Sequence, residues 1–228
     1  MKNKAPEADT LDLARRAGID GIRVFKVDMS RDTKSMDAKV VGLFGTRRIV
    51  IYDTAITGLD RGELLTIVAH EMGHYVLGHV VTAILFWSCL LLVTLGLVHW
   101  SAGPSMKRYK KRFGFDRLDN IASLPLILLL MNVWLLLLSP AGLAFMRHHE
   151  HEADRFALEL TRDNHAAATA FVKLTQGVLG VPWHGWLYTA WRDTHPPLGD
   201  RIDFDNGYRP WQTGQPLTYD HLLRKTTK

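Results

Sequence analysis

Two long apolar stretches dominate the hydrophobic pattern of this chain. Residues 80–100 contain no charged side chain, and residues 121–145 contain none either. Each stretch reaches the roughly 20 apolar residues that a helix needs to cross a bilayer. The pattern therefore predicts an integral membrane protein with two transmembrane helices and polar portions on both sides of them.

Ahead of the first apolar stretch, the pattern breaks into short segments. Residues 22–27, 39–44 and 48–52 are rich in β-branched and aromatic residues, which is typical of strands. Gly45-Thr46, between the last two segments, predicts a tight hairpin. We expect a small antiparallel sheet here, preceded by a short amphipathic helix over residues 11–18.

A longer helix is expected to begin at Arg61. Asp60 and Glu63 have the spacing of a capping box, which places acidic groups at the positive end of the helix. No proline occurs between Arg61 and Pro104. Because proline is a strong helix breaker, the pattern predicts one helix that continues into the first apolar stretch.

The predicted fold class is an α+β membrane protein that is mostly helical. Residues 147–161 and 166–179 have helical patterns. The expected parts begin with an N-terminal segment with the small sheet (1–60) and a helix (61–79) that contains the motif His-Glu-Met-Gly-His and is expected to bind zinc. A transmembrane helix (80–100), a basic connecting loop (101–120), a second transmembrane helix (121–145) and a C-terminal helical part (146–228) follow.

Charge and cysteine content narrow the class of protein. The formal net charge is +5 at pH 7, and the basic residues are spread along the chain apart from a cluster at 107–112, beside a predicted span. Such a cluster usually contacts anionic lipid headgroups, so no nucleic-acid partner is expected. Since Cys89 is the single cysteine, no intrachain disulfide can form.

The candidate chemistry begins at residues 70–74, which read His-Glu-Met-Gly-His. Two histidines four residues apart on a helix point the same way, so His70 and His74 can bind one Zn²⁺. Glu71 lies about a third of a turn away, where it can take a proton from the water that a catalytic zinc activates. The motif predicts one zinc ion per chain and Glu71 as the general base.

A catalytic zinc usually has three protein ligands, so one ligand lies outside this motif. The spans form a hairpin, which returns the segment after residue 145 to the membrane face where His70 and His74 lie. Glu150 and Asp154 share a helical face, so one can bind the metal while the other accepts the ring N–H of a ligating histidine. The full set of candidates is His148, His149, Glu150, His151, Glu152 and Asp154.

Two other interpretations of the histidines stay open at this point. A segment as rich in histidine as 148–154 can also bind metal at the surface, without catalysis. His79 follows His74 by five residues and is expected to point to another face of the helix, as a helix-end or interfacial residue and not as a ligand.

The chain resembles the integral-membrane zinc metalloproteases of the CAAX prenyl protease type I family. Their pattern is HExxH, then membrane spans, then an Arg-x-x-Glu-x-x-Ala-Asp segment, then a His-Pro motif with Arg six residues after the His. The matching residues here are 70–74, 147–154, and His195-Pro196 with Arg201. Residues 35–38 and 48–54 resemble the family's substrate-edge strand and the strand that leads to its metal helix.

The resemblance implies a role for each matched residue. Glu150 would be the third zinc ligand, and Asp154 would be the hydrogen-bond partner of a zinc-binding histidine. His195 and Arg201 would stabilise the oxyanion of the tetrahedral intermediate, where a donor can be worth roughly 3 kcal/mol. The remaining histidines of the segment are then surface or interfacial residues: His148, His149 and His151.

The predicted function is that of a zinc metalloendopeptidase acting on membrane-associated or unfolded proteins. A substrate segment would add as a strand along residues 39–44. The alternative is a non-catalytic membrane scaffold or adaptor with a structural or vestigial zinc site, although a purely structural site has no use for Glu71. A second copy or a partner chain could supply further transmembrane helices.

Charge gives two answers about membrane orientation. The basic segment at 101–120, taken alone, favours a cytoplasmic position for that segment. However, the segment before the first span carries 12 Lys and Arg, and the family resemblance implies a catalytic side that faces the cytoplasm. We expect catalysis on the cytoplasmic side.

Overall fold

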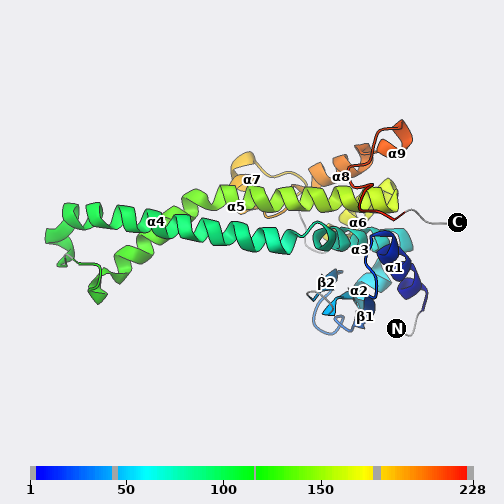
Figure 1. Cartoon of the computed structure of the whole chain (residues 1–228), viewed down its shortest axis with the longest axis horizontal. Helices are drawn as coiled ribbons and strands as arrows, with labels where there is room; N and C mark the ends of the chain where they lie inside the picture. The colour runs from blue at the N-terminus through cyan, green and yellow to red at the C-terminus, as the bar shows by residue number, and fades with distance from the viewer. Residues whose placement is uncertain (1–3, 43–45, 116, 177–180, 225–228) are drawn as a thin grey trace.

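A long pair of helices projects from the rest of the chain in the computed structural model, which describes residues 4–42, 46–115, 117–176 and 181–224 (Figure 1). This arm consists of α4 (His79–Phe113) and α5 (Leu124–Thr161), with the short 3₁₀ helix η2 (Ile121–Ser123) before α5. The elements gathered around its base are α1 (Lys4–Arg16), β1 (Arg23–Val27), β2 (Ala38–Val41), β3 (Arg48–Tyr52), α2 (Asp53–Gly58), α3 (Arg61–Val76), α6 (Asn164–Gln176), α8 (Leu198–Gly207) and α9 (Pro210–Thr213). The short helix α7 (Trp186–Arg192) lies alongside the arm (Figure 1).

The apolar residues of the arm point outward. Leu92 on α4 is 70% exposed and Leu136 on α5 is 61% exposed. Within the described ranges, two helices are long and apolar enough to cross a membrane, and they are these two. A soluble protein does not leave apolar surface of this extent in water. The predicted class, a mostly helical membrane protein with a small sheet, is confirmed.

The sheet is mixed, and the prediction of an antiparallel sheet is wrong for one pair of strands. The order is β1-β3-β2, with β1 parallel and β2 antiparallel to β3. Alternating apolar residues identify strands but not their partners, and the chain after β1 crosses to the far side of β3. Among the strands of the described ranges, β2 is thereby left with a free edge. It ends at Val41, before Gly42 with a φ of +99°; the predicted hairpin lies partly outside the described residues, because Gly45 does.

α3 and α4 are separate helices, so the prediction of one continuous helix is wrong. Asp60 and Glu63 form the expected capping box, with the Asp60 backbone N–H donating to the Glu63 carboxylate at 2.7 Å. α3 ends at Val76, and Gly78 takes a left-handed φ of +70° before α4 begins. Glycine in this conformation is a common helix terminator, so the lack of proline did not guarantee continuity.

Much of the segment predicted as a basic loop is helical instead. α4 continues through Pro104 to Phe113 and stops at Gly114, whose φ is +71°. Lys and Arg are good helix formers, so the basic cluster at 107–112 prolongs the helix beyond its apolar part. At 1.5 Å per residue the 35 residues of α4 extend roughly 52 Å, which exceeds the roughly 30 Å hydrocarbon core. The cluster lies at the far end of the arm, away from the base (Figure 1).

The two helices predicted after the second span are confirmed, with shifted ends. The first is the continuation of α5 to Thr161, without a break after the span. The second is α6, which is described over Asn164–Gln176; the predicted end at residue 179 lies outside the described residues. α5 therefore runs directly from the apolar arm into the base.

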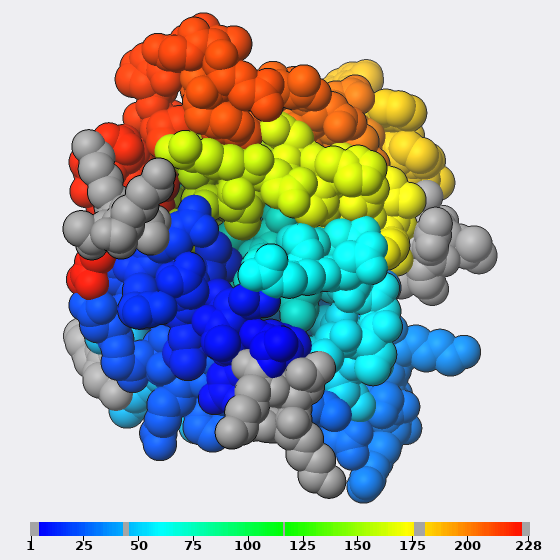
Figure 2. Space-filling view, turned by 90° about the vertical axis from the view of Figure 1, so that its right-hand side faces the viewer, coloured from blue at the N-terminus to red at the C-terminus, as the bar shows by residue number. Residues whose placement is uncertain are grey.

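The base is built around α3. Val68, Ala69 and Met72 on α3 are fully buried, as is Phe156 on α5, and α3 packs against α5, α6, α1 and β2. Seen from the end away from the arm, the N-terminal elements, the start of α3 and the α5–α6 layer follow one another, and the C-terminal elements cover the outer side (Figure 2). Apolar packing in this base fixes where α3 and α5 meet.

Gly73 is the point of close approach between these two helices. A Cβ on Gly73 would lie 3.2 Å from Cα of Ala153 and 3.2 Å from Cβ of Phe156. Separations this short leave no room for a larger residue unless α5 moves away. The glycine thus allows the histidines on either side of it to face α5.

Replacing Gly73 by Val is expected to destabilise the protein by about 1–3 kcal/mol, the usual cost of forcing extra carbon atoms into a packed interface. The variant should also bind less metal, because α3 and α5 would move apart and separate the candidate ligands. Gly96→Val is the matched control, since a Cβ at Gly96 on α4 meets no atom of the described residues within 4 Å. Thermal unfolding in detergent and metal analysis would check this; equal stability of the two variants would contradict it.

Candidate metal centre

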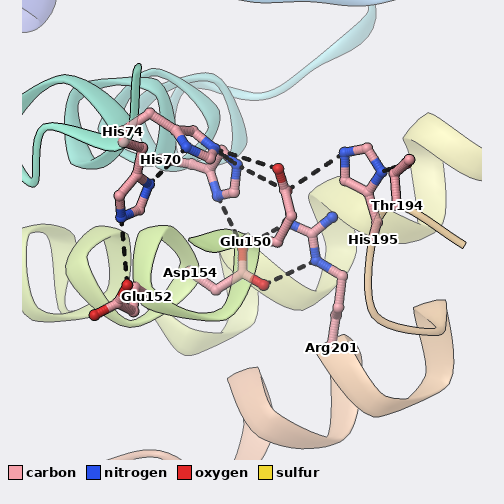
Figure 3. Close-up of polar contacts among 9 residues, drawn as sticks. His70, His74, Glu150, Glu152, Asp154, Thr194, His195 and Arg201 are labelled. Carbon is pink, nitrogen blue, oxygen red and sulfur yellow. Dashed lines mark hydrogen bonds and ion pairs between the residues drawn. The ribbon is translucent and has the colours of Figure 1, made fainter. Parts of the chain in front are cut away.

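Three candidate metal ligands converge between α3 and α5 (Figure 3). Nε2 of His70 lies 3.0 Å from Nε2 of His74. The Glu150 carboxylate lies 3.4 Å from each of these nitrogens, through a different oxygen to each. Such separations are compatible with one Zn²⁺ held about 2.0–2.1 Å from each donor. The described residues therefore fit zinc, and the predicted third ligand does reach the two histidines.

The second ring nitrogen of His70 has its own partner. Nδ1 of His70 lies 2.8 Å from the Asp154 carboxylate, and Asp154 is only 3% exposed. A carboxylate accepts, so His70 carries its proton on Nδ1, and Nε2 is left with a lone pair for a metal. This is the role that the family resemblance implied for Asp154.

Arg201 holds that carboxylate in place. Its guanidinium donates to both oxygens of Asp154, at 2.8 and 2.6 Å, and its Cζ lies 4.0 Å from the centre of the Phe171 ring. The distance from Arg201 to Glu150 is longer, 3.6 Å. Two of its donors are thus committed to Asp154, in the planar bidentate geometry that Arg forms with carboxylates.

His74 is supported by His79, a residue that was expected to point to another face of the helix. Nδ1 of His74 lies 2.8 Å from Nδ1 of His79, and Nε2 of His79 lies 3.4 Å from the Glu152 carboxylate. The expectation for His79 assumed a continuous helix. Because the chain breaks at Gly78, the first residue of α4 turns back toward the end of α3, and His79 is buried behind His74.

His79, His149 and Glu152 form a second group of potential ligands. The His79 and His149 rings are stacked, with centroids 4.0 Å apart and planes 1° from parallel. Ring lone pairs lie in the ring planes, so two stacked rings cannot direct them at one ion. We therefore interpret this group as packing behind the first centre.

The exposure of the neighbouring histidines differs from the prediction at one position. His149 is only 5% exposed, so its prediction as a surface or interfacial residue is wrong. The side chain of His148 is 66% exposed, as expected for a surface residue.

His195 reaches the centre from the segment between α7 and α8. Its Nε2 lies 3.4 Å from the Glu150 carboxylate, and its Nδ1 lies 2.8 Å from the Thr194 hydroxyl. If that hydroxyl donates, the proton of the neutral ring is on Nε2, on the side of the metal centre. The structure thus brings His195 to the Glu150 carboxylate although the two residues are 45 positions apart in the sequence.

A cavity of about 120 Å³ opens beside two of the three candidate ligands, His70 and Glu150. Glu71, His195 and Arg201 line its polar side, and Met36 and Phe171 are among the residues of its apolar side. Burial raises the pKa of the Glu71 carboxyl, which makes it a stronger base than an exposed carboxylate. The predicted base therefore faces the same space as the ligands.

Comparison with known proteins finds similarity to one family of metallopeptidases. The model of peptidase family M48 matches residues 2–204. The chain is 33% identical over 202 residues to the metalloprotease YhfN of Bacillus subtilis, covering 89% of this chain and 47% of that protein. It is 34% identical over 200 residues to the CAAX prenyl protease 1 homolog of Dictyostelium discoideum, covering 83% and 44%.

A solved structure shares the fold. The crystal structure of S. mikatae Ste24p matches with a TM-score of 0.70 at 23% identity, covering 89% of this chain and 50% of that one. The chain thus spans about half the length of the relatives that it matches.

Proposed function

Since the chain belongs to peptidase family M48 and has two helices that can cross a membrane, we propose that it is a membrane zinc endopeptidase that hydrolyses peptide bonds in membrane-associated or unfolded proteins. The observation that carries this proposal is the convergence of His70, His74 and Glu150 within 3.0–3.4 Å of one another. We propose these three residues as the ligands of one zinc ion per chain, on the cytoplasmic side of the membrane.

Zn²⁺, when bound, supplies a water of near-neutral pKa and polarises the scissile carbonyl. The Glu71 carboxylate takes the proton of the attacking water and passes it to the leaving amine. Because burial raises the pKa of Glu71, its carboxylate accepts this proton more readily, and the acid that results can still donate it. His70 and His74 are kept in the ligating tautomer by Asp154 and His79.

His195 is the donor that we propose for the developing oxyanion. Its side chain is 58% exposed, so it is accessible to a substrate, and Nε2 faces the centre. Preorganised donors at this place can contribute roughly 3 kcal/mol to transition-state stabilisation. The family resemblance implied that Arg201 shares this role with His195, whereas its bidentate contact with the Asp154 carboxylate favours Arg201 as a positioning residue for Asp154.

A substrate segment would pair with β2. β2 has a free edge, and Met36 and Asp37, just before it, line the cavity beside the ligands. Backbone pairing along an exposed strand gives affinity with little dependence on sequence, which suits unfolded substrates. The free edge thus supports substrate binding along residues 39–41 of the predicted stretch.

The alternative, a membrane scaffold with a structural zinc, fits the ligand set less well. Structural zinc sites are closed by four protein ligands, whereas catalytic sites keep a position open. In the described part of the chain, the group around His70 and His74 has a single further member, Glu150. A centre with three protein ligands retains a place for water, which supports the hydrolase.

Removal of zinc tests the proposed function. The purified chain in vesicles should cleave an unfolded membrane-protein substrate, lose this activity after treatment with a zinc chelator, and regain it when Zn²⁺ is restored. Product fragments on a gel and zinc content by mass spectrometry provide the readouts. Cleavage that continues after complete loss of zinc would contradict the mechanism. A zinc-loaded protein that cleaves nothing would favour the scaffold.

A further inference from the structure

An exposed apolar surface covers α7 and the residues just before it. We call Trp183, Trp186, Leu187 and Tyr188 the aromatic face; their exposed fractions range from 53% to 75%. Residues 181–191 contain no Lys, Arg, Asp or Glu. Apolar surface in water costs roughly 25 cal/mol per Å² relative to burial, so side chains of this size favour an apolar neighbour.

α7 lies alongside the α5 helix of the arm (Figure 1). Nε1 of Trp191 donates to the Leu136 carbonyl at 3.0 Å, and Leu136 belongs to the apolar stretch. Arg147, just past the end of that stretch, donates to the carbonyls of Thr189 and Asp193, each at 2.8 Å. These contacts fix α7 against the last turns of the span.

The polar groups of this segment are directed inward. The Arg147 guanidinium satisfies carbonyls at the C-terminal end of α7, where a positive charge also complements the helix dipole. Nδ1 of His184 lies 2.9 Å from the Asp193 carboxylate. Backbone groups near a bilayer need protein partners because hydrocarbon offers none. Contacts of this kind leave the aromatic face as the outward surface.

We propose that the aromatic face is inserted into the lipid bilayer, at the boundary between headgroups and hydrocarbon. The aromatic face continues the apolar surface of α5, because α7 contacts Leu136 and Leu135, Leu136 and Leu137 are all exposed. One bilayer can therefore cover both surfaces. Trp and Tyr are enriched at this boundary, where an amphipathic ring has one apolar end and one hydrated end. A helix of seven residues lies in the interface and does not span.

Insertion would fix the height of the metal centre above the membrane. Two residues, Asp193 and Thr194, connect α7 to His195, so lipid contact by α7 places the opening of the cavity beside the bilayer surface. Substrate segments close to a membrane anchor would then be the accessible class. This consequence rests on the proposed function, whereas the lipid contact itself does not.

Spin labelling tests the insertion without any measurement of catalysis. In a Cys89→Ala background, Leu187→Cys carries a nitroxide on the aromatic face, and the full chain is reconstituted in vesicles of phosphatidylcholine and phosphatidylglycerol. Collision with oxygen reports lipid, and collision with a water-soluble nickel chelate reports water. Leu92→Cys, in the middle of the apolar stretch on the lipid-facing side of α4, is the reference for the hydrocarbon core. The ratio of oxygen to nickel collisions falls from the centre of a bilayer to its surface, so the ratio at 187 should lie between that at 92 and that of a position in water.

Val172→Cys is the aqueous reference, because Val172 is a 40% exposed apolar residue on α6, which belongs to the base. Insertion predicts a severalfold higher ratio at 187 than at 172. A ratio at 187 equal to that at 172 would place the aromatic face in water and overturn the proposal. Low collision with both reagents would also overturn it, by showing that protein covers the face. Tyr188→Cys provides a second position if the first variant does not fold.

Discussion

Glu71→Gln is expected to lower the rate of peptide hydrolysis by roughly 10²–10⁴-fold, the contribution of a general base, while zinc remains bound. Glutamine has nearly the same size and shape as glutamate, but its amide cannot take the proton of the attacking water. The three proposed ligands are other residues, so the substitution leaves their donor atoms in place. The substitution should therefore lower kcat and leave the zinc content of the protein unchanged.

Glu7→Gln is the matched control for this experiment. It makes the same chemical change on α1, away from the residues that line the cavity, and should leave both kcat and zinc content unchanged. Single-turnover cleavage in vesicles together with zinc analysis would separate the two variants. Full activity of zinc-loaded Glu71→Gln would show that another group moves the proton, and would leave the metal assignment intact.

The sequence predicted those features that local chemistry determines. Two apolar stretches of spanning length identified α4 and α5, and the Asp60–Glu63 spacing identified the start of α3. The four-residue spacing of His70 and His74 was sufficient to place both rings on one side of a helix. Each of these features depends on residues within a few turns of each other.

Features that depend on contacts between distant segments could not be predicted from local sequence. Residues 148–154 offered six candidates for the third metal ligand, and only the family resemblance selected Glu150. In the structure, α3 and α5 cross at Gly73, and this crossing brings Glu150 to His70 and His74. The parallel pairing of β1 with β3 had no sequence signal. A signal did exist for His79: a glycine directly before it permitted the break that turns it back to His74.

The choice of the third ligand can be tested by comparing neighbouring carboxylates. Glu150→Gln is expected to reduce zinc affinity by more than the roughly 10–100-fold that the loss of an outer hydrogen-bond partner costs. A neutral amide oxygen replaces a charged donor that lies 3.4 Å from both ring nitrogens. Hydrolysis should be lost together with the metal, and competition with a zinc-binding dye would measure the affinity.

Glu152→Gln distinguishes a direct ligand from an acidic residue nearby. Glu152 lies on the same helix but forms ion pairs with His79 and His148, at 3.4 Å each, and not with His70 or His74, the two proposed ligands. Its loss acts on the metal only through His79 and His74, so the decrease in affinity should stay within the range for outer partners. If instead Glu152→Gln lost its zinc and Glu150→Gln retained it, the metal would be bound by the group around His79. The stacked rings of His79 and His149 would then have to rotate apart to accommodate it, and the proposed role of Glu71 would have to be abandoned.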